Sequence, residues 1–252
     1  MDTATLIDAT ASPVSQLGGA FYFTSETAAV AERLGLDVFM LYCLGRGGVL
    51  GDDVDVDKVV DAFRWFAPGL VRTLWQEGRE ITPPSKAAAA YLEAARDYAR
   101  RTFAASPALE GFCPAAERVV AAAPTRRWPF VDGYRRFELA EDVVARAYQL
   151  VVVLREMRGA AHAEAVAELG LSPAEAHYLT SADQFELYGY DATDVPVVTE
   201  ELVERRALAE DRTTDLLVGS YSVLDADGSG AFLEGVRELA ATADIDVEDV
   251  AV

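Results

Sequence analysis

Residues 159–180 read GAAHAEAVAELGLSPAEAHYLT, and this stretch decides which fold we expect. Apolar residues recur through residues 161–169 and predict a short helix. A turn follows at Gly170, after which Ser172 and Pro173 supply an N-cap and a first helical residue for a second short helix. Two short helices around a glycine-containing turn are typical of a helix-turn-helix.

The segments around this motif predict an all-α protein. Helical spacing of apolar residues predicts helices over residues 25–34, 38–44, 55–66, 86–103, 138–158, 199–217 and 231–241, with only a short helix near 115–123. The glycines around Arg46 indicate that the backbone turns there. Residues 188–198 predict a small β-hairpin, the wing of a winged helix. The expected fold class is therefore all-α, a winged-helix-like helical protein with a minor β-hairpin.

Composition suggests how the chain is organised. Residues 1–104 form an N-terminal helical half that holds an aromatic cluster, and residues 105–136 form a connection rich in Pro and Arg. Residues 137–252 form the helix-turn-helix half. A single compact domain is the alternative to this division.

The chain is strongly acidic, with 42 Asp and Glu against 22 Lys and Arg and a net charge of −20. This charge repels nucleic acid and anionic membranes unless basic residues gather in one patch. The apolar stretch of residues 147–154 is far too short to span a bilayer, and residues 1–5 lack the features of a secretory signal. Cys43 and Cys113 show no CxxC spacing and are expected to be buried thiols. We expect a cytoplasmic protein with no membrane partner.

The helix-turn-helix segment itself is poorly suited to DNA. Residues 159–204 contain ten acidic residues and no Lys or Arg, whereas affinity for DNA depends on basic side chains that neutralise phosphates. The second short helix offers Glu175 and His177 as its polar side chains. We therefore do not expect DNA to be a partner.

Motifs for metals and cofactors are absent from the sequence. The only two histidines, His162 and His177, lie 15 positions apart, without HExxH or CxxC spacing. The glycines around Arg46 match neither a P-loop nor a dinucleotide fingerprint. Residues 225–230 begin like a calcium loop, but Val236 occupies the position of the bidentate Glu, so we expect a capped turn. We expect no metal and no cofactor.

The chain also resembles a known family, and the matching residues follow one another along its length. They are Phe21-Tyr22-Phe23, Gly45-Arg46, Leu50-Gly51 and Phe66-Ala67-Pro68, then Leu154-Arg155-Glu156, Arg158-Gly159 and His162, and finally Val198-Thr199 and Thr214-Asp215. On these residues it resembles the actinobacterial SalK-like helix-turn-helix family, one member of which is encoded in a natural-product gene cluster. The resemblance implies a winged-helix-like all-α fold and no particular activity. The sequence departs from the family at Met157, where a histidine is usual.

Three residues of the central match are candidate catalytic residues: Arg155, Arg158 and His162. If residues 155–162 are helical, their spacings of three, four and seven place them on one face, where they would suit a carboxylate or phosphate of a ligand. Two alternatives remain open at this point. Gly159 could end the helix first, or the arginines could form an ion-pair network with Glu156, Glu138 or Asp142.

Five residues are candidates for ligand binding: Tyr22, Phe23, Arg46, Trp65 and Phe66. A cleft lined by rings and a few arginines is how small-molecule sites are usually built. Arg46 could reach into such a cleft, or could pair with Asp52 or Asp53 instead.

These observations predict a small-molecule-binding protein. It would bind an anionic or aromatic organic compound, or act on it as a non-redox enzyme of secondary metabolism that uses acid-base or electrostatic catalysis without a bound nucleotide. A winged-helix transcriptional regulator is the alternative. A third reading is an interaction module or homodimer without a ligand, in which the protein's own side chains fill the cleft.

Overall fold

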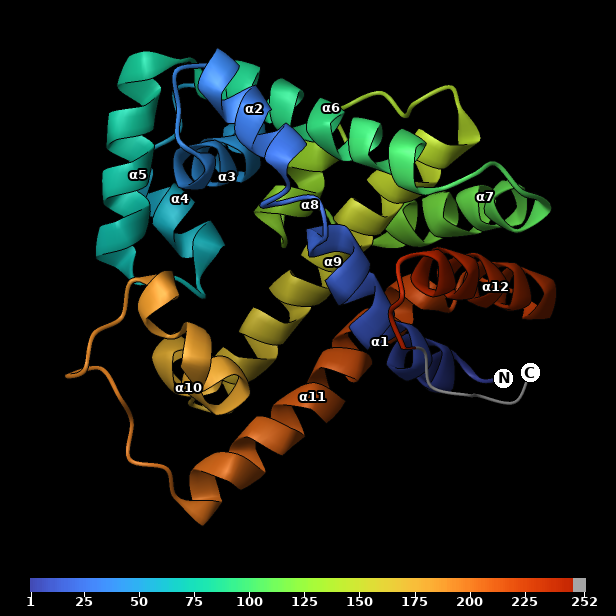
Figure 1. Ribbon diagram of the computed structural model, residues 1–252. Coiled ribbons are helices and arrows are strands. Elements are labelled where there is room, and N and C mark those ends of the chain that lie inside the picture. Colours follow the sequence, from blue (N-terminus) through green and yellow to red (C-terminus); the bar gives the residue numbers. More distant parts are fainter. Residues whose placement is uncertain (247–252) are drawn as a thin grey trace.

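The computed structural model describes residues 1–246, which contain twelve α-helices, three short 3-10 helices and no strand (Figure 1). The all-α prediction is confirmed. The helices are α1 (Thr3–Gly19), α2 (Ser25–Arg33), α3 (Val38–Gly47), α4 (Val56–Phe63), α5 (Pro68–Ile81), α6 (Pro84–Thr102), α7 (Pro107–Ala122), α8 (Pro129–Tyr134), α9 (Val143–Glu168), α10 (Pro173–Ser181), α11 (Glu200–Tyr221) and α12 (Ala226–Thr242). The 3-10 helices are η1 (Gly48–Leu50), η2 (Ala182–Gln184) and η3 (Glu186–Tyr188).

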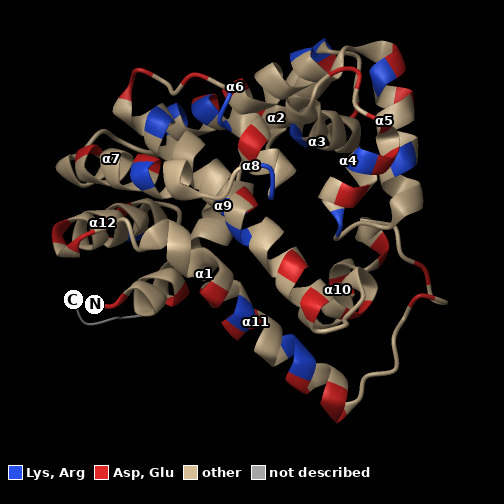
Figure 2. Ribbon diagram, turned by 180° about the vertical axis from the view of Figure 1, so that it is seen from behind, with Lys and Arg blue, Asp and Glu red and all other residues tan. Residues whose placement is uncertain are grey.

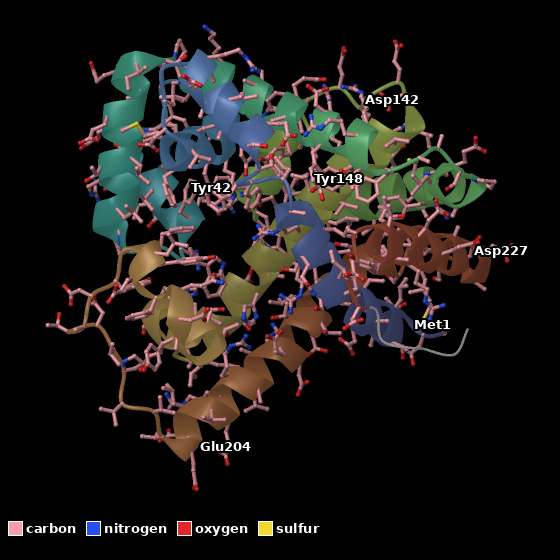
Figure 3. All side chains as sticks on the ribbon, in the orientation of Figure 1. Met1, Tyr42, Asp142, Tyr148, Glu204 and Asp227 are labelled. Carbon is pink, nitrogen blue, oxygen red and sulfur yellow. The ribbon has the colours of Figure 1, made fainter. Side chains whose placement is uncertain are left out.

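Helix α9 runs diagonally through the middle of the molecule, and α1, α6, α7 and α11 pack around it (Figure 1). Its N-terminal half is buried on nearly every side, which is what a central helix requires. The hydroxyl of Tyr148, labelled in Figure 3, donates a 2.6 Å hydrogen bond to the carbonyl of Leu17 and so fastens α9 to α1. None of the helices in residues 1–246 combines the length and hydropathy of a membrane span.

The glycines around Arg46 do not turn the backbone, contrary to the sequence prediction. Helix α3 continues through them to Gly47. Glycine occurs at these positions because each one lets a neighbouring segment approach closely. A Cβ on Gly45 would lie 2.5 Å from Cγ of Tyr91, and one on Gly48 would lie 2.0 Å from the carbonyl oxygen of Pro84. The helical conformation holds Arg46 on the inner side of α3, where it is 6% exposed.

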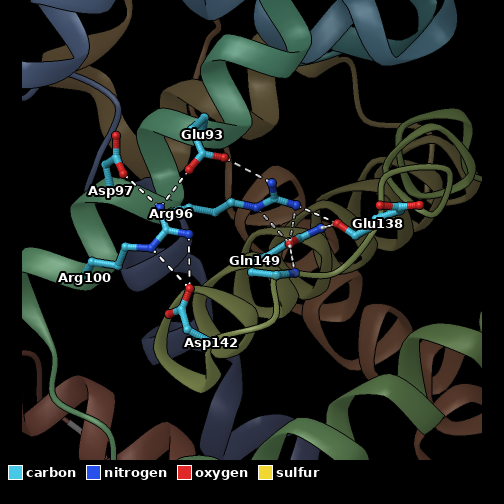
Figure 4. A network of polar contacts seen from close by, with 8 residues as sticks. Glu93, Arg96, Asp97, Arg100, Glu138, Asp142 and Gln149 are labelled. Carbon is cyan, nitrogen blue, oxygen red and sulfur yellow. Dashed lines mark hydrogen bonds and ion pairs between the residues drawn. The ribbon is translucent and has the colours of Figure 1, made fainter.

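A polar network joins α6 to the start of α9 (Figure 4). Arg96 donates to the side-chain oxygen of Gln149 and to the carbonyl of Glu138, and Arg100 donates to the carboxylate of Asp142. Asp142 also caps α9 by accepting from the N–H of Ala145 at 2.9 Å. The carboxylate of Asp142 and the backbone of Glu138 therefore serve this network.

The segment predicted to hold only a short helix near 115–123 forms the sixteen-residue helix α7 instead. Ser106 caps this helix and Pro107 occupies its first turn, and Pro114 is accommodated inside it. Helix α7 packs against α12 as well as α9. A Cβ on Gly235 of α12 would lie 2.3 Å from Cβ of Phe112, so glycine allows the two helices to touch. Asp225, the first residue of the calcium-like stretch, is the N-cap of α12.

The helix-turn-helix segment differs from its prediction in its first helix. Its first helix is not separate, because α9 continues without a break past residue 158 to Glu168. Gly170 then adopts φ +70° and provides the turn, and Ser172 and Glu175 form a capping box at the start of α10. A small second core made of Ala165, Val166, Leu171, Ala176, Leu202 and Ala209 holds this part together.

The predicted β-hairpin over 188–198 is wrong, so the winged-helix form is not supported. Gly189 turns the chain with φ +86°, and no strand follows it in residues 190–199. Pro196 lacks an N–H group for a strand ladder. Val197 is 84% exposed, so the alternation of apolar residues in this stretch has no core to face.

Candidate functional site

A cavity of about 920 Å³ lies between α9, α10 and α11 on one side and α1, α3, α4 and α8 on the other. Figure 1 shows the arrangement of α4, α8, α9 and α10, each of which contributes residues to its lining. A ligand of ordinary metabolite size fits a cavity of this volume. All three candidate catalytic residues, Arg155, Arg158 and His162, line it, and so do Arg46, Trp65 and Phe66 from the ligand-binding candidates.

The cavity is more basic than the molecule around it. Seven basic side chains line it, against five acidic ones, although the whole chain has a net charge of −20. The basic residues are Arg46, Lys58, Arg64, Arg127, Arg155, Arg158 and Arg206, and the acidic ones are Asp8, Asp61, Glu156, Glu164 and Glu210. A cavity with this excess attracts anions electrostatically.

Arg46 and Glu156 form a buried ion pair at the α3 and α9 side of the cavity. Nε of Arg46 lies 2.9 Å from Oε1 of Glu156 and Nη2 lies 2.8 Å from Oε2, and the two side chains are 8% and 3% exposed. The third arm of the guanidinium donates to the hydroxyl of Tyr42, which Figure 3 shows on the inner side of α3. Asp52 and Asp53 are therefore not the partners of Arg46.

Arg155 is held differently from Arg46. Its Nε donates to the carbonyl of Ser15 at 3.0 Å, and its guanidinium lies 4.9 Å from the centre of the Tyr22 ring. The closest carboxylate oxygen, Oε1 of Glu156, is 4.0 Å away and already accepts from Arg46. The stem of Arg155 fits against α1 because Gly18 has no side chain.

Arg158 and Arg206 share the carboxylate of Glu210 on α11. Nη2 of Arg158 lies 2.8 Å from one oxygen of Glu210, and Nη1 of Arg206 lies 2.5 Å from the other. Glu138 and Asp142 are thus not partners of Arg155 or Arg158. The ion-pair network considered from the sequence exists in part, with Glu156 and Glu210 as its acids.

His162 lies beside the cluster of Arg158, Arg206 and Glu210 and is 7% exposed. Its Nδ1 is 2.8 Å from the hydroxyl of Thr213 and 3.9 Å from Oε2 of Glu210. Burial lowers the pKa of His162 from 6.5 to about 4, despite the opposing effect of the Glu210 carboxylate. His162 is therefore neutral at physiological pH.

Aromatic rings form the wall opposite α9. Arg64, the residue after α4, adopts φ +31°, and the turn that it makes leads into Trp65, whose ring lies 5.3 Å from that of His162 at 23°. Phe66 stacks on Tyr188 of η3 with ring centres 4.3 Å apart. The N–H of Ala67 donates to the carbonyl of Tyr188 at 2.8 Å. This contact ties the segment after α10 to the start of α5 and closes one side of the cavity.

Helix α10, which a helix-turn-helix would present to DNA, faces the cavity. Ala176, His177 and Thr180 are among its lining residues. His177 is 8% exposed, and Nε2 of its ring is buried without a partner among the described residues. Glu175 uses its carboxylate to accept from the N–H of Ser172 in the capping box. Figure 2 shows acidic positions and no basic ones on α10 and the loop that follows.

Two of the predicted ligand-binding residues do not line the cavity. Tyr22 is 6% exposed and packs between Phe21, Tyr42 and the guanidinium of Arg155, so it supports the site from behind. Phe23 is 54% exposed and touches Phe39 on the outside.

Sequence reasoning missed several residues that the cavity brings together. Tyr42, Phe130 and Tyr188 belong to its wall, and Thr213 and Glu210 of α11 fix His162 and Arg158. Glu210 and Thr213 lie 52 and 51 positions away from the residues that they contact in α9, and nothing in the local pattern of these five residues distinguishes them from core or surface residues. Gly159 suggested the opposite of what the structure shows, because a glycine at this position is typical of a helix end, whereas α9 continues past it.

Comparison with known protein families bears on the part of the chain that carries most of this site. The model of a helix-turn-helix family matches residues 7–195, which extend from within α1 to beyond η3. The chain belongs to this helix-turn-helix family. No curated protein and no solved structure matches it. The matched range of the helix-turn-helix family contains every predicted site residue, and it ends before α11, which supplies Glu210 and Thr213.

Proposed function

We propose that this member of the helix-turn-helix family binds a small organic anion in the cavity between α9 and α10. The observation that carries the proposal is the cavity of about 920 Å³, which combines an excess of basic side chains with walls of aromatic rings. Those are the elements of a site for an anionic aromatic compound, in which rings supply contact area and arginines fix an acidic group.

Gly159 supports the same proposal. It lies within α9 and lines the cavity, and a Cβ built on it would meet no atom within 4 Å. A glycine in a helix interior costs about 1 kcal/mol relative to alanine. Its presence keeps the surface of α9 bare between Arg155 and His162, so that a ligand can lie against the backbone.

The experiment fills the open space next to Gly159 with a larger side chain at that position. Gly159→Leu places a side chain in the cavity and should preserve or slightly raise the melting temperature, since leucine favours helices. Gly219→Leu is the matched control, because Gly219 lies on the exposed side of α11 and its Cβ would also meet no atom. The probes are aromatic carboxylic acids and their uncharged amides, tested by thermal shift and ligand-observed NMR.

We expect aromatic carboxylates to raise the melting temperature of the wild type and of Gly219→Leu, and to have no effect on Gly159→Leu. The proposal is wrong if no probe binds the wild type, or if the Gly159→Leu protein binds the same probes as strongly.

An enzymatic role in secondary metabolism would use the same cavity. Arg155 and the neutral ring of His162 are the groups available for electrostatic or acid-base chemistry, and the resemblance to the SalK-like proteins favours a natural-product substrate. Consumption of a bound probe, followed by mass spectrometry, separates an enzyme from a binding protein.

Membership in a helix-turn-helix family favours a second candidate, a DNA-binding regulator. This candidate requires α10 to leave the cavity wall, because His177 is buried and Glu175 serves the capping box. It also requires a basic surface, which residues 159–204 do not provide. An interaction module without a ligand is a weaker candidate, since its own side chains would have to fill the cavity.

A further inference from the structure

Two clusters of charged side chains in the cavity each carry one net positive charge, and the cluster around Arg155 contains the more deeply buried carboxylate. Glu210 faces two arginines, but its side chain is 41% exposed and water screens this cluster. Glu156 is buried and its two oxygens already accept from Arg46. Arg46, Arg155 and Glu156 together therefore carry one net positive charge, and the donors of Arg155 that do not serve Ser15 are those that remain for an anion.

The hydrogen bonds of His162 determine which of its nitrogens carries the proton. The hydroxyl of Thr213 has one hydrogen and donates it to the carbonyl of Ala209 at 2.6 Å. The same oxygen must then accept from Nδ1 of His162, 2.8 Å away. The carboxylate of Glu210, 3.9 Å from Nδ1, also favours a proton on this nitrogen.

The consequence is that Nε2 of His162 has a free lone pair. Within residues 1–246 no side chain or backbone group donates to it, and His162 lines the cavity. A neutral imidazole in this tautomer accepts a hydrogen bond and repels an anion's oxygen. His162 and Arg155 thus recognise opposite kinds of group, although the sequence suggested that they converge on one anion.

We infer that the ligand has two recognised ends: a carboxylate or phosphate bound by Arg155, and a hydroxyl or N–H group that donates to Nε2 of His162. The inference rests on the proposed function of the cavity. Seven residues of helix separate the two side chains, which corresponds to about 10 Å along α9. Gly159 lies between them and leaves the helix surface open, and Trp65, stacked on His162, provides a ring at the donor end.

Matched probe pairs test this inference with the full-length chain. Each pair is a phenylalkanoic acid and its para-hydroxylated form, with the chain lengthened from benzoate through 3-phenylpropionate to 5-phenylpentanoate. At one chain length the hydroxylated acid should bind the wild type about tenfold more tightly, the gain from one well-placed hydrogen bond. A buried hydroxyl of the wrong length gains nothing, so the advantage should depend on chain length.

Two variants separate the two ends. His162→Phe keeps a ring against Trp65 and removes Nε2, so it should abolish the advantage of the hydroxyl and bind both members of a pair with equal affinity. Arg155→Met should weaken both members of a pair by the same factor. The inference is overturned if the hydroxyl gives no advantage at any length, if the advantage survives in His162→Phe, or if uncharged amides bind as tightly as the acids.

These outcomes are distinct from failure of the proposed function, which Gly159→Leu detects with any probe. If His162→Phe does not fold, histidine ¹⁵N NMR of the wild type provides a second measurement, because the chain has only two histidines. We expect an unprotonated Nε2 for His162 whose resonance moves when the hydroxylated acid is added and stays in place with its unhydroxylated partner. A protonated Nε2, or an equal shift with both, contradicts the inference.

Discussion

The guanidinium of Arg46 and the carboxylate of Glu156 meet through two hydrogen bonds of 2.9 and 2.8 Å, across 110 positions of sequence. Both groups are buried, so each one is stable only because the other is present. Tyr42, Phe63 and Phe130 enclose the guanidinium, which lies 4.9–5.0 Å from the centre of each ring. The pair joins α3 to α9 and fixes the inner end of the cavity.

Glu156→Gln should therefore lower the free energy of unfolding by about 3 kcal/mol or more, because it leaves the charge of Arg46 buried without a counter-ion. Glu168→Gln, on the same helix, is the control. Glu168 pairs with Arg212 at the surface, where both side chains are about 40% exposed, and its loss should cost at most about 1 kcal/mol. Urea denaturation of the two variants measures both values, and equal losses would contradict the assigned role of the buried pair.

Gly18→Ala should displace Arg155. The added Cβ would lie 2.7 Å from Cδ of Arg155, so we expect a loss of about 1–3 kcal/mol together with weaker binding of aromatic carboxylates. Gly230→Ala in α12 is the control, because its Cβ would meet no atom. That change should stabilise the protein by up to about 1 kcal/mol. Stabilisation by Gly18→Ala as well would show that α1 and Arg155 are not in close contact.

The neutral state of His162 should make stability depend on pH. Its pKa in the folded protein is about 4, below the value of 6.5 for an unperturbed histidine. The unfolded chain therefore binds more protons between these values, and stability is complete above about pH 6.5 and falls as the pH drops toward 4. The loss attributable to His162 is about 3 kcal/mol over this range.

His162→Asn isolates this effect from the carboxylates and from His177, whose pKa burial also lowers. Free energies of unfolding measured from pH 7 to pH 4 should rise less steeply with pH in the variant than in the wild type. Identical slopes would mean that His162 is not the group that titrates.

Gly189 should control how firmly η3 is attached to α5. A Cβ there would lie 2.7 Å from Cβ of Leu70, and the residue has φ +86°. Gly170→Ala shares only the backbone strain, since Gly170 has φ +70° and open space around it. The additional loss in Gly189→Ala measures the packing contact, and we expect it to be accompanied by faster hydrogen exchange in η2 and η3. Equal losses in both variants would argue that this contact contributes nothing.

A gel shift at low salt against DNA from upstream of its own coding region should show no specific complex. Ten acidic residues and no basic one in residues 159–204 leave this segment without phosphate contacts. Binding that persists at moderate salt would favour the regulator over the ligand-binding protein.

The sequence predicted the helices whose ends carry strong local signals. Ser172 with Pro173 marks α10, and Ser25 with Gly35 brackets α2. It did not reveal α1, whose apolar residues are spread among Thr, Ser and Ala and whose Pro13 lies inside the helix. The glycines within α3 suggested a turn and the glycine within α9 suggested the end of a helix, and the structure contains neither. Glycine also occurs where segments pack closely or where space is left open.

The candidate site could be predicted where it lies on a single helix. Arg155, Arg158 and His162 belong to the central match of the resemblance, helical spacing places them on one face, and all three line the cavity. What each of them does depends on α1 and α11, through Ser15, Glu210 and Thr213. No pattern within one segment encodes those partners, because the tertiary fold brings them together.

The continuity of α9 limits how the cavity can admit a ligand. The first half of α9 is embedded among α1, α6 and α7. Its last two turns, which serve as the first helix of the helix-turn-helix, belong to the same uninterrupted helix. A hinge at that place would break helical hydrogen bonds. If a segment moves to widen this side of the cavity, it must be α10 with residues 182–199, which Gly170 joins to α9 and the hydrogen bond from Ala67 to Tyr188 ties to α5.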